Sequence, residues 1–189
     1  MVINENLTEQ LKLKTALFDT NVLSTIKKYT KNLDVRYFLS TLNKQKCSVC
    51  VNDLIRLEFL RDANKHGELT ERKKYLAALC AEVSLSISQQ TYSDAMLLSY
   101  IHVRHKNKGI EFVDLMTSAL LKNYSHNQGL VLVTANHKDF PLSVHDRIGS
   151  IVLDLGKDLA TLGFYRINME KWNKEVIDLL KDETWNSDK

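Results

Sequence analysis

Three acidic residues lie beside apolar segments rather than in polar stretches of the sequence. Asp19 directly follows the apolar residues 16–18, Glu58 has leucines close on either side, and Asp114 lies within the apolar run 112–115. A charged side chain in such surroundings is unfavourable unless it has a partner. Carboxylates that converge on one crevice repel one another, and a hard divalent cation such as Mg²⁺ or Mn²⁺ relieves that repulsion.

A second polar group follows the apolar run 130–134. Asn136 and Asp139 lie just beyond this run, which ends at Thr134. A continuous run of β-branched residues and leucine is typical of a strand buried on both faces. For Asp19 alone, capping of the helix that follows is an equally good explanation, because Asp is a preferred N-cap residue. The acidic residues taken together favour a site.

The elements that must position these residues follow from hydrophobic periodicity. Strands that alternate with helices are typical of an α/β protein with a parallel sheet, in which ligands bind beyond the carboxyl ends of the strands. The predicted strands cover 13–18, 48–51, 83–87, 130–134 and 151–155, and the predicted helices cover 22–28, 35–42, 71–80, 91–103, 112–123 and 169–181, with a further helix capped by Asn52 or Asp53.

Length and composition indicate one globular domain, with 189 residues of which 44% are hydrophobic and 26% charged. No apolar run reaches the roughly 20 residues that cross a bilayer, and the N-terminal residues lack the order of a secretory signal. We therefore expect a cytoplasmic protein without a membrane partner.

The net charge of +3 does not by itself indicate a nucleic-acid partner. Basic residues do gather locally, and such groups either meet phosphates or form ordinary solvated surface. They are Lys27, Lys28, Lys31, Lys44, Lys46, Arg104, Lys106 and Lys108.

The cysteines offer an alternative metal or redox site. Cys47 and Cys50 form a Cys-x-x-Cys pair inside an apolar run, and Cys80 is a third cysteine. No second Cys or His pair follows at zinc-ligand spacing, so buried free thiols are the preferred interpretation.

The histidines offer a transition-metal or acid–base site. His102 and His105 are three residues apart on a predicted helix, but no third ligand is near in sequence, so we interpret both as solvated polar residues. His137 follows Asn136 and has the best position to reach the acidic crevice. His126 and His145 have no spacing that supports a ligand role.

Four short motifs occur in order along residues 13–155. They are Asp19-Thr20-Asn21 at the end of the first strand, Glu58 in the helix after the second strand, Asp114 with Ala119 in a later helix, and Thr134-Ala135-Asn136 with Asp139-Phe140 after a buried strand. In order and context they resemble the motifs of the PIN-domain nucleases, and in particular of the VapC-like toxin ribonucleases of type II toxin–antitoxin systems.

The resemblance implies a three-layer α/β/α PIN-like fold around a central parallel sheet of about five strands. The nuclease domain would cover 13–155, and 156–189 would form a C-terminal helical extension packed on the same domain. The implied activity is an Mg²⁺- or Mn²⁺-dependent endoribonuclease that hydrolyses RNA phosphodiester bonds. The implied partners are an RNA substrate, an antitoxin protein and a second copy of the chain in a homodimer.

The resemblance also implies a role for each site residue. Asp19, Asp114 and Glu58 would bind the metal, Asp139 would be a further catalytic residue, and Thr20, Asn21, Thr134 and Asn136 would form the outer shell or touch the substrate. Many relatives carry a fourth carboxylate where this chain has Asn136. Either Asn136 supplies a neutral ligand, or Asp139 takes over that role.

Two alternatives belong to other classes. In a phosphatase Asp19 would be the nucleophile, but such enzymes want a second Asp two residues further on, where this chain has Asn21. The other alternative is a catalytically weak or inactive PIN-like module that binds RNA or a protein partner without cutting. The amide of Asn136 in place of an acid is the feature that favours it.

Overall fold

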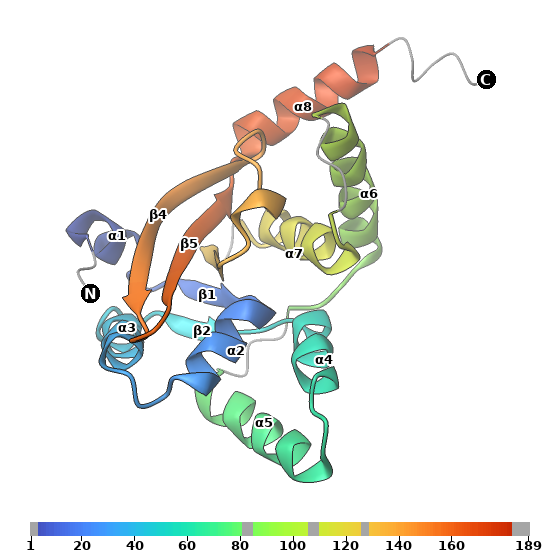
Figure 1. The fold of residues 1–189 in the computed structure, drawn as a ribbon. Coiled ribbons are helices and arrows are strands. Elements are labelled where there is room, and N and C mark those ends of the chain that lie inside the picture. Colours follow the sequence, from blue (N-terminus) through green and yellow to red (C-terminus); the bar gives the residue numbers. More distant parts are fainter. Residues whose placement is uncertain (1–3, 81–84, 106–109, 126–128, 183–189) are drawn as a thin grey trace.

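The computed structural model describes residues 4–80, 85–105, 110–125 and 129–182. Within these ranges the chain is an α/β protein with eight α-helices, a short 3-10 helix and one five-stranded sheet (Figure 1). None of these helices is long and apolar enough to span a bilayer. The helices are α1 (Glu5–Gln10), α2 (Thr20–Lys28), α3 (Leu33–Lys44), α4 (Asp53–Arg61), α5 (His66–Leu79), α6 (Gln89–Arg104), α7 (Phe112–Asn123), α8 (Met169–Lys181) and the 3-10 helix η1 (His137–Asp139). The strands are β1 (Thr15–Phe18), β2 (Ser48–Cys50), β3 (Leu130–Thr134), β4 (His145–Asp154) and β5 (Leu159–Ile167).

The sheet is mixed, with the strand order β2-β1-β3-β5-β4. β1 runs parallel to both β2 and β3, whereas β5 runs antiparallel to both β3 and β4. The prediction of a parallel sheet is therefore correct for β2, β1 and β3 and wrong for the other two strands. Only residues 155–158 connect β4 to β5. Such a short connection makes a hairpin, because a parallel crossover needs a dozen or more residues.

Strand β5 is the largest difference from the predicted elements. The resemblance implies a helical extension over 156–189, but 159–167 is a strand of the central sheet and helix begins only at Met169. Gly163 interrupts the strand pattern in the sequence. In the structure a Cβ at Gly163 would come within 2.6 Å of the Tyr165 ring and 2.8 Å of His137 Nδ1, so the close packing here requires glycine.

The predicted elements 112–123, 130–134 and 169–181 are confirmed with the predicted ends, and the others are confirmed with shifted ends, apart from one strand. Of the predicted strand 83–87, residues 83–84 lie outside the described residues and 85–87 are not in a strand. The short helix α1 is absent from the predicted elements. α5 begins at His66 rather than at 71, and β4 begins at His145 rather than at 151.

Aromatic packing joins the two halves of the sheet through α3. Phe18 at the end of β1 stacks on Phe38 of α3 with ring centroids 5.9 Å apart, and Phe38 meets Phe164 of β5 edge-on at 6.2 Å. α2 and α7 both contact β3. The carboxyl ends of β1 and β3 are therefore held beside the first turns of α2 and α7, where polar side chains gather.

Candidate functional site

Asp19 lies where β1 ends and α2 begins, as the sequence predicts. Its carboxylate is only 6% exposed and accepts hydrogen bonds from Thr20 N at 2.7 Å and Asn21 Nδ2 at 2.6 Å. A third donor is Thr134 Oγ1 at the end of β3, at 2.6 Å. Burial raises the pKa of Asp19 above its ordinary value, and the three hydrogen bonds oppose that shift. Asp19 is thus both a helix cap and an oriented buried carboxylate.

Glu58 reaches the same place from α4. This helix is capped by Asn52, whose Oδ1 accepts from Ile55 N at 2.8 Å, which decides between the two predicted caps. Glu58 is half-buried and accepts a hydrogen bond from Thr20 Oγ1. A carboxylate with apolar neighbours was expected to have a polar partner, and for Glu58 this partner is the hydroxyl group of Thr20. The hydrogen bond connects α4 to the start of α2.

Asp114 differs from Asp19 and Glu58 in its hydrogen bonding. It lies in the first turn of α7 and is 8% exposed, and within the described part of the chain no group donates a hydrogen bond to its carboxylate. Burial raises its pKa to about 8, and nearby negative charges act in the same direction. These charges belong to Asp19, Asp139, Glu111 and Glu58. Acidic side chains from separate segments therefore lie close enough to disfavour ionisation of Asp114.

The segment after β3 contains Asn136 and Asp139, the two candidates for the position where many relatives carry a fourth carboxylate. Asn136 lines the cleft that the acids share, whereas Asp139 is buried and does not line it. Asn136 Nδ2 donates a hydrogen bond to Asp139 Oδ2, and Asn136 N donates to Thr134 Oγ1 at 2.9 Å. Asn136 is thus the residue presented to a ligand, and Asp139 holds its amide group in place.

Asn21 acts as a connector rather than as a second nucleophile or ligand. Its Nδ2 donates to Asp19 at 2.6 Å and lies 3.2 Å from Thr134 Oγ1, while its Oδ1 accepts from Ala135 N at 2.9 Å. These bonds fasten the first turn of α2 to the end of β3. Asn21 therefore keeps the two strand ends in register at the site.

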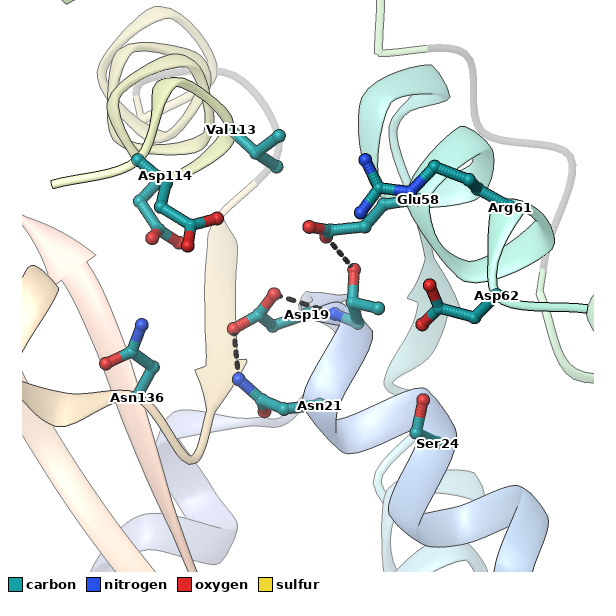
Figure 2. Close-up of a pocket in the computed structure, with 11 residues that line it drawn as sticks. Asp19, Asn21, Ser24, Glu58, Arg61, Asp62, Val113, Asp114 and Asn136 are labelled. Atoms are coloured by element: carbon teal, nitrogen blue, oxygen red, sulfur yellow. Dashed lines mark hydrogen bonds between the residues drawn. The ribbon is translucent and has the colours of Figure 1, made fainter.

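The acidic residues line one cleft of about 300 Å³ (Figure 2). Asp114 projects from one side and Glu58 from the other, with Asp19 between them. Asp19, Thr20, Asn21, Ser24, Glu58, Arg61, Asp62, Glu111, Val113, Asp114 and Asn136 line it. Of the predicted site residues, Asp139 and Thr134 do not line this cleft, and the following do: Asp19, Thr20, Asn21, Glu58, Asp114 and Asn136.

Three charged lining residues are absent from the sequence predictions. Asp62 and Arg61 follow Glu58 by about one turn of α4, and Glu111 precedes Asp114 at the N-cap of α7. Residues three or four apart on a helix share a face, and this spacing is the signal that would have found the two α4 residues. None of the described basic residues singled out in the sequence lines the cleft, and Lys106 and Lys108 lie outside the described residues.

The chemistry of the cleft suits a hard cation, although its carboxylates do not yet converge. Its donors are carboxylate, amide and hydroxyl oxygens, the ligands that Mg²⁺ and Mn²⁺ prefer. Among the described residues no three His, Cys, Asp or Glu side chains stand in an arrangement that holds a metal ion. The donor set therefore fits such a cation, and binding would have to draw the carboxylates together.

The described histidines lie away from the cleft. His137 Nδ1 is 2.9 Å from the Tyr165 hydroxyl, and His105 Nε2 lies 3.0 Å from Glu175 Oε1. His102 is 3% exposed, so its interpretation as a solvated residue is wrong, because the face of α6 that carries it is packed into the core. His145 is fully buried, and His126 lies outside the described residues.

The three cysteines are free, and two of them are buried as expected. Burial raises the pKa of Cys47 to about 11 and that of Cys50 to about 12, and the pKa of the half-buried Cys80 also rises to about 11. Such thiols stay protonated at neutral pH, and only a thiolate is a good nucleophile or zinc ligand.

No protein-family model matches this chain, and no curated protein matches it.

Proposed function

We propose that the chain is a metal-dependent endoribonuclease of the PIN type, with helices layered on both sides of the central sheet. The observation that carries the proposal is the shared cleft of Asp19, Glu58 and Asp114, in which burial, and after it the nearby negative charges, raise the pKa of Asp114 to about 8. Carboxylates that repel one another in a cleft are the arrangement that a divalent cation stabilises. The order of the four motifs along the chain supports the same family.

Asp19, Asp114 and Glu58 are the residues that would hold Mg²⁺ or Mn²⁺. When bound, the cation lowers the pKa of a water molecule and offsets charge on the phosphate and the leaving oxygen. Asp19 is already oriented by three donors, so its position needs no rearrangement. Among the described residues none donates a hydrogen bond to the Asp114 carboxylate, so its oxygens are available to a cation once it has lost its proton.

The remaining polar residues would orient these ligands. Thr20 donates to Glu58, and Thr134 donates to Asp19. Asn136 presents its amide to the cleft while Asp139 holds that amide in place. In this proposal Asp139 is a positioning residue, and Asn136 supplies a neutral oxygen or touches the RNA.

The proposal includes the biological setting that the resemblance implies. RNA is the substrate, and the cytoplasm is the compartment. A toxin of a toxin–antitoxin pair would also have an antitoxin protein that covers the acidic cleft, and it would form a homodimer.

The test is cleavage of mixed single-stranded and structured RNAs by the purified protein with Mg²⁺ or Mn²⁺. We expect cleavage that EDTA abolishes and that Asp19→Asn and Asp114→Asn remove. Asp53→Asn is the matched control, because Asp53 lies on α4 with its side chain 89% exposed and does not line the cleft. Intact RNA under both metals, from folded protein without a bound inhibitor, would contradict the proposal.

The second candidate is a PIN-like module that binds RNA or a protein without cutting. Asn136 favours it, because an amide faces the cleft where many relatives have an acid. This module would bind RNA equally well with and without EDTA and would leave it intact. The same RNA assay therefore separates the two candidates.

A further inference from the structure

Arg61 is the exception in the acidic cleft. Of the charged side chains in the described part of the chain that line the cleft, Arg61 is the basic one, beside Asp19, Glu58, Asp62, Glu111 and Asp114. It occupies the last residue of α4, three positions after Glu58, and its side chain extends from α4 on the side of the cleft where Glu58 lies (Figure 2).

The guanidinium group of Arg61 is unpaired despite these acidic neighbours. In the described residues it makes no ion pair and no hydrogen bond, and it is exposed. Two other arginines, one on α4 and one on α5, do find partners. Arg56 Nε lies 3.9 Å from Asp53, and Arg72 Nη2 lies 2.7 Å from Glu68. Arg61 therefore keeps all its donors available to a ligand that enters the cleft.

A second arginine fixes the turn from which Arg61 extends. Arg72 of α5 donates to the carbonyl oxygens of Phe59 at 2.6 Å and Asp62 at 3.2 Å, which are acceptors left free where α4 ends. The Arg72 guanidinium is itself held by Glu68 through bonds of 3.1 Å and 2.7 Å. The end of α4 is thus braced on both sides of Arg61, and only the Arg61 side chain has to adapt.

We propose that Arg61 binds a phosphate of the RNA backbone next to the bond that is cut. This inference rests on the proposed ribonuclease function. The planar fork of a guanidinium group matches two phosphate oxygens, and its charge does not depend on pH. An acidic cleft repels a polyanion, so a cation beside the metal-binding carboxylates gives the backbone an attachment point there. Arg61 thus supplies attraction that the carboxylates alone do not.

The test compares Arg61→Gln, Arg61→Lys and the control Arg56→Gln. Arg56 lies on the same helix, about 140° around its axis from Arg61, and does not line the cleft. Binding of a short labelled single-stranded RNA is measured in EDTA over a range of salt concentrations, and cleavage is measured separately with Mn²⁺. Thermal melting establishes that each variant is folded.

We expect Arg61→Gln to weaken RNA binding by about tenfold to a hundredfold, as for a lost charge-assisted hydrogen bond. It should also reduce the slope of log Kd against log salt by about one, because one phosphate contact is lost. Arg61→Lys should keep the slope and recover only part of the affinity, because it keeps the charge without the fork. Arg56→Gln should match the wild type in both measurements.

Equal affinity and slope for Arg61→Gln and Arg56→Gln would overturn the inference, as would a wild type that binds no RNA. The result for binding is independent of cleavage. If the wild type binds RNA through Arg61 but cuts none, the proposed ribonuclease function fails while the phosphate contact stands.

Discussion

The acidic cleft and the histidine region, which consists of His102 and His145, both contain buried ionisable side chains, but the ionisation of these side chains shifts in opposite directions. At the ends of β1 and β3, the buried carboxylate of Asp19 accepts hydrogen bonds and lines a cleft that it shares with Asp114 and Glu58. Between α6 and β4, His102 and His145 lie in the core. Among the described residues both ring nitrogens of His102 and Nε2 of His145 lack a hydrogen-bond partner.

The pKa shifts express this difference. Burial lowers the pKa of His102 and of His145 to about 4, so both rings are neutral at physiological pH. Burial raises the pKa of Asp114 to about 8, and other carboxylates add to that shift. The histidines lose their charge and become part of the core, whereas the crowded carboxylates stay beside solvent, where a cation can reach them. A buried ionisable group indicates a binding site when it also faces a cleft.

The largest expected effect is on cleavage. Asp114→Asn should reduce the rate at least about a hundredfold, since even changes to the outer shell of a metal site reach that size. His102→Leu should leave the rate within about twofold, because His102 does not line the cleft. Cleavage rates are measured with Mn²⁺. If the rate fell equally in both variants, the acidic cleft would not differ from the histidine region in its importance for cleavage.

The second effect is on stability without metal. Asp114 loses its proton near pH 3.8 in the unfolded chain and near pH 8 in the folded one. Between these values the folded state binds more protons, so the unfolding free energy falls as pH rises. In EDTA, the unfolding free energy of Asp114→Asn should equal that of the wild type near pH 4. At pH 8 it should be higher than that of the wild type, by on the order of a few kcal/mol.

Urea denaturation at both pH values measures this difference, with Asp53→Asn as the exposed control. Added Mg²⁺ at pH 8 should stabilise the wild type and not Asp114→Asn, because the cation needs the carboxylate. A difference that does not depend on pH would mean that Asp114 ionises normally in the folded chain.

A smaller effect is expected from the hydroxyl group that joins α2 to α4. Thr20→Val removes the hydrogen bond to Glu58 and should slow cleavage by about tenfold, the effect of one displaced outer-shell group. Thr20→Ser should restore most of the rate. Thr25→Val is the matched control, because Thr25 lies on the same helix and does not line the cleft. Equal cleavage rates for the Thr20→Val and Thr25→Val proteins would show that cleavage does not need the hydrogen bond from Thr20 to Glu58.

The smallest effect concerns the histidine region. The unfolded chain takes up a proton on His102 near pH 6.5 and the folded chain only near pH 4, so the wild type loses stability as pH falls through this range. His102→Leu should therefore be more stable than the wild type by about 1–2 kcal/mol at pH 5. Urea denaturation at pH 5 and pH 7.5 tests this, with the exposed His66→Leu as control. A destabilised variant at both pH values would show that His102 has a partner in solution.

The sequence alone determined the features that depend on neighbouring residues. Asp19 was placed correctly because a buried strand followed by a helix cap is a local pattern. The same holds for α7, which places Asp114 in its first turn, and for β3, which ends at Thr134. Periodicity and capping act over a few residues, so a single chain contains them.

Only the tertiary structure decided which side chains meet. β5 joins the sheet because a four-residue connection folds it back on β4, although Gly163 weakens its local pattern. Asn136 rather than Asp139 faces the cleft because η1 turns Asp139 inward. The partner of Glu58 and the unpaired state of Arg61 depend on how α4 lies against α2 and α5. Such contacts join segments far apart in sequence, and neither propensity nor spacing along the chain determines their geometry.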